Sequence, residues 1–271
     1  MTILITGATG LVGARLLPRL VEAGMECRAL MRAGKRPPPG VVGVEGDLLD
    51  PSTLAHAVTG ISAVVHLAAV FRTADEEMIW KTNLEGTCNL IAAVKANASD
   101  ARFIMASTSL VYDRGGAHPG REDDATDPKQ AYPASKIAAE NALRASGLNW
   151  SIQRFAFVYG DGDGHLESLP KLATGAGFHP AQRMSMVHHR DIAAATIRAL
   201  GGAMDGRIVN LVDDAPTSIH ELAELVGEPM NPSSEPLTHP WYLQAEGALA
   251  RSLGLEPTVR TVYQARSENL L

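Results

Sequence analysis

Residues 2–13 read TILITGATGLVG, and this stretch decides the fold class. A short apolar run, typical of a buried strand, is followed by glycines at intervals of three (Gly7, Gly10 and Gly13) and then by a helical pattern. Such a turn brings backbone N–H groups and a helix N-terminus against a pyrophosphate without obstruction by Cβ atoms. The stretch therefore predicts a dinucleotide-binding turn, with an ordinary glycine-rich turn as the alternative.

Strand-length apolar runs and helical patterns continue to alternate through the first half of the chain, which is typical of a parallel sheet with helices on both faces. The expected strands are residues 27–31, 41–45, 63–67, 102–106 and 150–155, and the expected helices are 54–58, 76–96 and 131–145. We therefore predict an α/β fold with a Rossmann-type doubly wound parallel sheet. A dinucleotide-binding domain is expected over residues 1–158 and a smaller substrate-binding region over 159–271, with parts near 187–212 returning to the first domain.

The composition is that of a globular protein that forms a hydrophobic core. Of 271 residues, 45% are hydrophobic and 20% are charged, which excludes a disordered tail, a collagen-like fibre and a disulfide-stapled mini-domain. The net charge of -6 argues against broad binding of nucleic acid or anionic membranes. The N-terminus has no signal-peptide pattern, and no apolar run approaches the ~20 residues that span a bilayer. We expect a cytoplasmic protein that acts on a small molecule, with no nucleic-acid or membrane partner.

The end of the second predicted strand bears on which dinucleotide is bound. An NAD site usually has an acidic residue there, whereas this chain has Arg32, with Lys35 and Arg36 close behind. These cations suit a 2′-phosphate, so the sequence favours NADP(H) over NAD(H), and a solvated basic loop is the alternative. Other residues expected beside the cofactor are Asp47, Leu48, Ala68 and Ala69.

A tyrosine and a lysine lie four residues apart in a predicted helix, at Tyr132 and Lys136. This spacing puts both side chains on one helix face. A phenol with a pKa of ~10 is a poor base at neutral pH, so a neighbouring ammonium would be needed to lower its pKa. Hydroxyl groups at residues 107–109 follow a predicted strand, at the sheet edge where ligands bind. Together these residues predict a proton-transfer site.

The sequence resembles the extended short-chain dehydrogenase/reductase family, also called the NAD-dependent epimerase/dehydratase family. The motifs that carry the resemblance are Thr6-Gly7-Ala8-Thr9-Gly10-Leu11-Val12-Gly13, Asp47-Leu48, His66-Leu67-Ala68-Ala69, Asn83-Leu84-Glu85-Gly86-Thr87, Ser107-Thr108 with Val111-Tyr112, Tyr132-Pro133-Ala134-Ser135-Lys136, Arg154 with Val158-Tyr159-Gly160, and Val187-His188 with Asp191-Ile192-Ala193. The resemblance implies that Tyr132 is the acid/base, Lys136 its partner and Thr108 the donor to the substrate oxygen. It also implies that Asn83 holds the long helix and a proton-relay water, and it suggests a homodimer.

The complete set of expected site residues follows from these patterns and from the resemblance. The catalytic residues are Thr108, Tyr132, Lys136 and Asn83. The cofactor-binding residues are Gly7, Thr9, Gly10, Leu11, Val12, Gly13, Arg32, Asp47, Leu48, Ala68, Ala69, Ser107, Tyr132, Lys136 and Phe155. The substrate-binding residues are Thr108, Ser109, Phe157, Met184 and His188. No metal site is expected, because His188 and His189 have no carboxylate at metal-ligand spacing.

Departures from the family pattern narrow the expected activity. Family dehydratases carry an Asp-Glu pair after the catalytic Thr, where this chain has Ser109 and Leu110. Met184 stands where nucleotide-sugar epimerases have their diphosphate-binding Arg, and the neighbouring Arg183 is the alternative residue for that role. We therefore expect an NAD(P)-dependent reductase or dehydrogenase acting on a carbonyl or alcohol. A UDP-sugar 4-epimerase with tightly bound NAD and a non-catalytic dinucleotide sensor are the alternatives.

Overall fold

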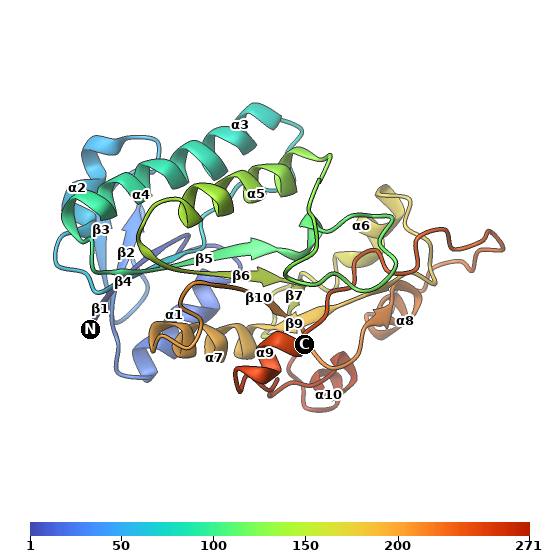
Figure 1. The fold of residues 1–271 in the computed structure, drawn as a ribbon. Helices are drawn as coiled ribbons and strands as arrows, with labels where there is room; N and C mark the ends of the chain where they lie inside the picture. The colour runs from blue at the N-terminus through green and yellow to red at the C-terminus, as the bar shows by residue number, and fades with distance from the viewer.

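The computed structural model describes residues 1–271. Its central feature is a seven-stranded parallel sheet (Figure 1). Every neighbouring pair of strands is parallel. The strand order reverses between β1 and β4, which is where ligands bind in doubly wound sheets. In spatial order the strands are β10 (Arg207–Leu211), β6 (Asn149–Phe155), β5 (Arg102–Thr108), β4 (Ala63–His66), β1 (Thr2–Thr6), β2 (Glu26–Met31) and β3 (Val41–Glu45).

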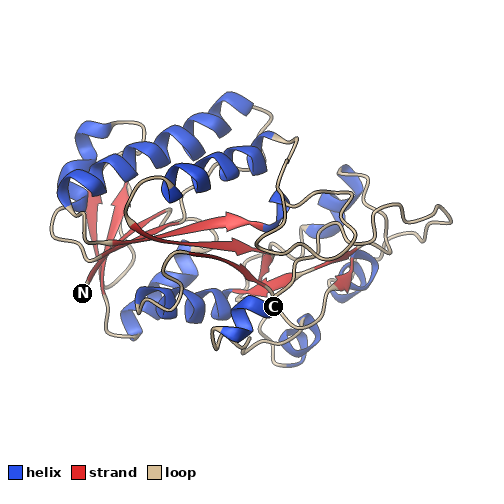
Figure 2. Cartoon of the chain, viewed as in Figure 1, coloured by secondary structure: helices blue, strands red, loops and turns tan.

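Helices cover both faces of this sheet, which confirms the predicted doubly wound fold (Figure 2). One face carries α2 (Leu54–Val58), α3 (Glu76–Trp80), α4 (Gly86–Asn97) and α5 (Ala131–Arg144). The opposite face carries α1 (Gly13–Glu22) and α7 (His189–Leu200), which contact each other. No helix has both the length and the apolar character that crossing a bilayer requires.

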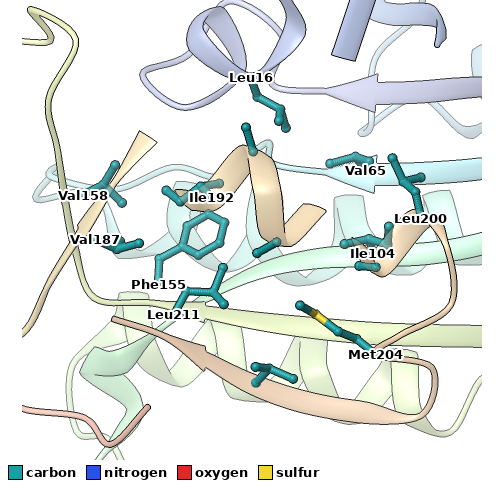
Figure 3. Packing of buried hydrophobic residues seen from close by; sticks show 14 of the residues in the cluster. Leu16, Val65, Ile104, Phe155, Val158, Val187, Ile192, Leu200, Met204 and Leu211 are labelled. Carbon is teal, nitrogen blue, oxygen red and sulfur yellow. The ribbon is translucent and has the colours of Figure 1, made fainter. Parts of the chain in front are cut away.

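Between the sheet and the helices α1 and α7 lies a hydrophobic core. Apolar helix residues at helical spacing pack there against alternate residues of the strands. Figure 3 shows Leu16 of α1 and Ile192 of α7 together with the strand residues Val65, Ile104 and Phe155. All five side chains are buried. Burial of side chains of this size contributes roughly 1.5–3 kcal/mol each, so this layer holds both helices firmly on the sheet.

The long helix predicted over residues 76–96 is continuous but contains a wider turn. A π-helical segment, Lys81–Glu85, joins α3 to α4. Asn83 lies in this segment, is fully buried, and bonds both backbone groups of Val70, accepting from the N–H at 2.7 Å and donating to the C=O at 3.0 Å. The wider turn therefore holds the chain segment that follows β4.

After β6 the chain leaves the main sheet at Ala156 and forms smaller elements. The strands are β7 (Phe157–Tyr159), parallel to β9 (Met186–His188), and β8 (Arg183–Met184), antiparallel to β11 (Thr217–Ser218). The helices are α6 (Leu169–Gly175), α8 (Ile219–Leu225), α9 (Ala248–Ser252) and α10 (Val262–Ser267), and short 3-10 turns are Pro51–Thr53 and Ser109–Val111. A capping box between Ser218 and Glu221 starts α8.

The end of the chain lies against the loop that follows β7. Asp161 N–H donates to the carbonyl oxygen of Leu270 at 2.9 Å, and Gly162 N–H donates to Leu271 at the same distance. Asp163 in this loop accepts a hydrogen bond from His189 of α7 at 2.8 Å, with both side chains buried. The loop is thus fixed between the last residues and α7.

Candidate functional site

The turn between β1 and α1 requires glycine for steric reasons. Gly7 has a φ of +70°, and a Cβ there would lie 2.7 Å from the backbone nitrogen of Ala68. A Cβ on Gly13 would lie 2.2 Å from the carbonyl oxygen of Gly7. No side chain caps α1, and the N–H groups of Leu11, Val12 and Gly13 have no acceptor within the protein. The turn therefore presents free donors at a helix N-terminus, which is what a pyrophosphate group requires.

A cavity of about 970 Å³ opens from this turn along the carboxyl ends of the central strands. Its size is at the upper end of the range for small-molecule sites. The charged side chains in its wall are predominantly cationic, which suits an anionic dinucleotide. The Lys and Arg residues are Arg32, Lys35, Arg72, Arg114 and Lys136, and the one carboxylate is Asp47.

All the residues expected to bind the cofactor lie in the wall of this cavity. Arg32 and Lys35 lie just beyond β2, as the sequence indicates. Asp47 accepts a hydrogen bond from the Leu49 N–H at 2.9 Å, so one of its oxygens already has a partner. The glycine turn and this wall fit a nicotinamide dinucleotide.

Tyr132 and Lys136 face the same cavity from the first turns of α5. The Lys136 side chain is buried, and burial lowers its pKa to about 8 although the Glu140 carboxylate opposes this shift. Burial raises the pKa of the Tyr132 phenol to about 12. The expected lowering by Lys136 is not observed, because burial is the only cause that acts on this pKa. The ring of Phe71 lies 4.2 Å from that of Tyr132, measured between centroids.

The hydroxyl groups at the end of β5 have different partners. Thr108 lines the cavity, and its Oγ1 accepts a hydrogen bond from the Leu110 N–H at 3.2 Å, which leaves its own hydrogen free to donate. Ser107 instead donates to Glu140 at 2.5 Å. Thr108 is therefore the hydroxyl better placed to donate to a substrate oxygen.

A buried hydrogen-bond network lies behind the site and was not predicted from the sequence. Glu140 of α5 accepts from Arg154 of β6 at 2.7 and 3.1 Å, and both side chains are almost fully buried. Arg154 also donates to the Tyr112 hydroxyl at 3.1 Å, which in turn donates to Asn210 of β10 at 2.6 Å. The signal for Glu140 is its position four residues after Lys136 in the same helix.

Asn83 is placed behind the cavity wall rather than in it. Besides holding Val70, its side chain donates to Ser135 of α5 at 3.0 Å. Ser135 in turn donates to the Tyr132 carbonyl oxygen at 2.7 Å. The Ser135 hydroxyl therefore links Asn83 to the backbone of α5. The expected role of Asn83 concerned the long helix and a proton-relay water, and Asn83 itself does not line the cavity.

His188 does not reach the cavity, and its expected role in substrate binding is corrected. Its ring is fully buried and bonds the Leu270 carbonyl oxygen through Nε2 at 2.9 Å, while Nδ1 accepts from the Arg190 N–H at 3.1 Å. It also fills the space beside Gly160, where a Cβ would lie 2.1 Å from Nε2. His188 starts α7 and anchors the end of the chain. No group of three or more His, Cys, Asp or Glu side chains is arranged to hold a metal ion.

Most of the far half of the cavity is built by the region after β6, together with the turn after β5 and the segment after β4. Ser109, Phe157 and Met184, all expected to bind substrate, lie in the cavity wall. Arg72 and His165 were not predicted from the sequence, because they are far apart in the chain. They hydrogen-bond each other in the cavity wall. The remaining wall is mainly apolar and includes Leu110, Leu169, Leu172, Ala176, Phe178 and Leu243.

Comparison with known proteins identifies relatives of this arrangement. The model of the NAD dependent epimerase/dehydratase family matches residues 3–211. Among curated proteins, the ceramide reductase of Caulobacter vibrioides is 31% identical over 201 residues, which is 71% of this chain and 59% of that protein. The 2-alkyl-3-oxoalkanoate reductase of Stenotrophomonas maltophilia is 34% identical over 189 residues, 65% of this chain and 56% of that protein. The chain thus matches less than two thirds of the length of either relative.

Solved structures share the whole fold. The Bordetella bronchiseptica enzyme WbmG in complex with NAD is 25% identical, with a TM-score of 0.80, and the match covers 99% of this chain and 94% of that one. UDP-glucose 4-epimerase of Thermotoga maritima with UDP-glucose has a TM-score of 0.78 at 22% identity, over 98% of this chain and 96% of that one. At that identity the second likeness concerns the fold alone.

Proposed function

This chain belongs to the NAD dependent epimerase/dehydratase family, and we propose that within it the protein is an NAD(P)-dependent reductase or dehydrogenase that interconverts a carbonyl group and an alcohol. The observation that carries the proposal is the position of Tyr132, Lys136 and Thr108 in one cavity wall with the glycine turn. The names of the two curated relatives, both reductases, support the same class of reaction.

The proposed chemistry assigns a separate task to each of the three side chains. A bound nicotinamide supplies or accepts the hydride. Tyr132 holds its proton at neutral pH, because burial raises its pKa to about 12, and is therefore suited to protonate the carbonyl oxygen during reduction. Thr108 donates its free hydroxyl hydrogen to the same oxygen and orients it. Lys136 offsets the negative charge that proton transfer leaves on the phenolate.

We further propose that NADP(H) is preferred over NAD(H). Arg32 and Lys35 line the cavity beyond β2, while the one carboxylate in the wall, Asp47, already bonds a backbone N–H. Two cations at this position would bind a 2′-phosphate through charge-assisted hydrogen bonds. Arg32→Gln should weaken NADPH binding about tenfold or more and leave NADH binding unchanged. Arg36→Gln is the matched control, since Arg36 lies outside the wall; equal losses for both cofactors would contradict the preference.

Replacement of the phenol tests the proposed reaction. Tyr132→Phe should abolish turnover of a ketone panel while NADPH still binds, as measured by fluorescence titration. Tyr263→Phe is the control, because Tyr263 is exposed and bonds Glu221 outside the cavity. Full turnover by Tyr132→Phe would refute the mechanism. A nicotinamide that survives purification, together with interconversion of UDP-sugars, would favour the 4-epimerase instead, and cofactor binding without turnover of any substrate would favour a sensor.

A further inference from the structure

Part of the far half of the cavity has an apolar wall. Side chains from α6, the loop that follows it, β7, β8 and the turn after β5 form an apolar annex, defined here by Leu110, Phe157, Leu169, Leu172, Phe178 and Met184. Leu169 and Met184 belong to the hydrophobic core of the C-terminal region, so the annex extends to the edge of that core. Sugar hydroxyls would lose their hydrogen bonds to water there, whereas an aliphatic chain would gain by burial.

One arginine at this end of the cavity has no anionic partner. Arg114 is exposed, lines the cavity, and forms no hydrogen bond or ion pair with any side chain. Its guanidinium carbon lies 5.1 Å from the centre of the Tyr242 ring, which restrains the side chain and leaves the N–H edge free to donate. A restrained planar guanidinium is well suited to bind a carboxylate through two parallel hydrogen bonds.

Other candidate residues are less well suited than Arg114 to bind a carboxylate. Arg72 is hydrogen-bonded to His165. Met184 is apolar, so the position that the sequence comparison associates with diphosphate binding offers no charge. Arg121, seven residues further along the chain, is already paired with Glu246.

We infer that the substrate carries an aliphatic chain, which the annex accepts, and a carboxylate, which Arg114 binds. This inference rests on the carbonyl reductase function proposed above. The substrate class is therefore an aliphatic oxo acid, reduced to the hydroxy acid by addition of a hydride from the nicotinamide to the carbonyl carbon and of the Tyr132 proton to the oxygen.

The reverse reaction provides a stable probe. With NADP⁺ as oxidant, 3-hydroxydecanoate and its methyl ester should be compared by the formation of reduced nicotinamide. Arg114→Gln should raise KM for the acid at least about tenfold, because a charge-assisted hydrogen-bond pair is lost, and leave KM for the ester unchanged. Arg121→Gln is the matched control, since Arg121 is exposed and lies outside the cavity. An equal KM for the acid in Arg114→Gln and wild type would overturn the role of Arg114.

The annex is tested by chain length. Lengthening the hydroxy acid from four to ten carbons should lower KM in steps for the wild type, and Leu172→Asn should flatten this series. Leu172 is half-buried, so the substitution leaves the core intact. A flat series in the wild type would overturn the assignment of the annex.

Binding without turnover separates this inference from the proposed function. Decanoate, which has no carbonyl or hydroxyl group to react, should raise the Tm of the NADPH-bound wild type and of Arg121→Gln, but not that of Arg114→Gln. If decanoate binds through Arg114 but no hydroxy acid is oxidised, the redox function fails and the ligand class stands. If neutral ketones are reduced but decanoate does not bind, the ligand class fails and the redox function stands. If neither occurs, both are refuted.

Discussion

Replacing Glu140 by glutamine should strongly destabilise the protein. The Glu140 carboxylate accepts two hydrogen bonds from Arg154 and one from Ser107, and Glu140 and Arg154 are only 2% and 3% exposed. The substitution leaves the guanidinium charge buried without compensation and points an amide donor toward it. Breaking a buried pair from one side costs about 3–5 kcal/mol, which in a protein of this size lowers Tm by roughly 6–20 °C.

An exposed pair provides the matched control. Arg102 and Asp205 also form a bidentate ion pair, in which Nε donates to Oδ1 and Nη2 donates to Oδ2, each at 3.0 Å, but both side chains are 34% exposed. Asp205→Asn makes the same change of carboxylate to amide, and should cost at most about 1 kcal/mol because water screens the charge that remains.

Urea denaturation of the two variants measures both costs. If Glu140→Gln unfolds within about 1 kcal/mol of Asp205→Asn, the reasoning from burial is refuted. A double variant, Glu140→Leu with Arg154→Met, guards against failure to fold, since removing both charges should recover most of the stability.

The single variant Glu140→Gln should also alter the pH dependence of activity. Glu140 raises the pKa of Lys136 against the lowering caused by burial. Loss of the carboxylate charge therefore moves the Lys136 pKa below about 8, and the alkaline limb of the rate profile should shift to lower pH. An unmoved limb would show that the Lys136 ammonium does not control the rate.

Three further substitutions test the turn, a buried acid and a helix cap. Gly13→Ala should abolish NADPH binding in fluorescence titration, because its Cβ would lie 2.2 Å from the Gly7 carbonyl oxygen; retained affinity would contradict the steric argument. Burial raises the pKa of the Asp213 carboxyl from 3.8 to about 8. Between these values the folded state keeps a proton that the unfolded state loses, so the free energy of unfolding should fall by up to about 1.4 kcal/mol per pH unit as pH rises. Asp213→Asn should remove this slope in urea titrations across the window, and an unchanged slope would assign it to other groups. Ser218→Ala removes the hydroxyl of the capping box with Glu221 and should cost about 1 kcal/mol by the same assay, whereas no loss would mean that solvent caps α8 equally well.

Local patterns were sufficient to predict the main sheet. The expected strand at 41–45 and helix at 54–58 have the observed bounds. In the helix, the buried residues Leu54, Ala57 and Val58 follow the helical period. The π-helical segment at Lys81–Glu85 was missed, since it depends on Asn83 reaching the backbone of Val70, a contact that no local pattern encodes.

The sequence was sufficient to predict those parts of the site whose residues lie in one helix or at the end of one strand. The glycine turn and the Tyr132–Lys136 pair are two such parts. His188 was wrongly predicted to bind substrate. Its ring is buried against Gly160 and Leu270, and these contacts depend on the path of segments that are distant in the sequence. Arg114 was missed for the same reason, since its environment is made by Tyr242 from the far end of the chain.

The contacts of the final residues have a practical consequence for fusion proteins. Leu270 and Leu271 bond the loop that begins at Asp161, and His165 of the same segment lines the cavity. A tag attached after Leu271 therefore starts beside the loop that leads to His165. We expect such a tag to lower the affinity of the cavity for its ligand. Met1 is exposed at the amino end of the sheet, away from the cavity, so a tag placed there should leave ligand affinity unaltered (Figure 1).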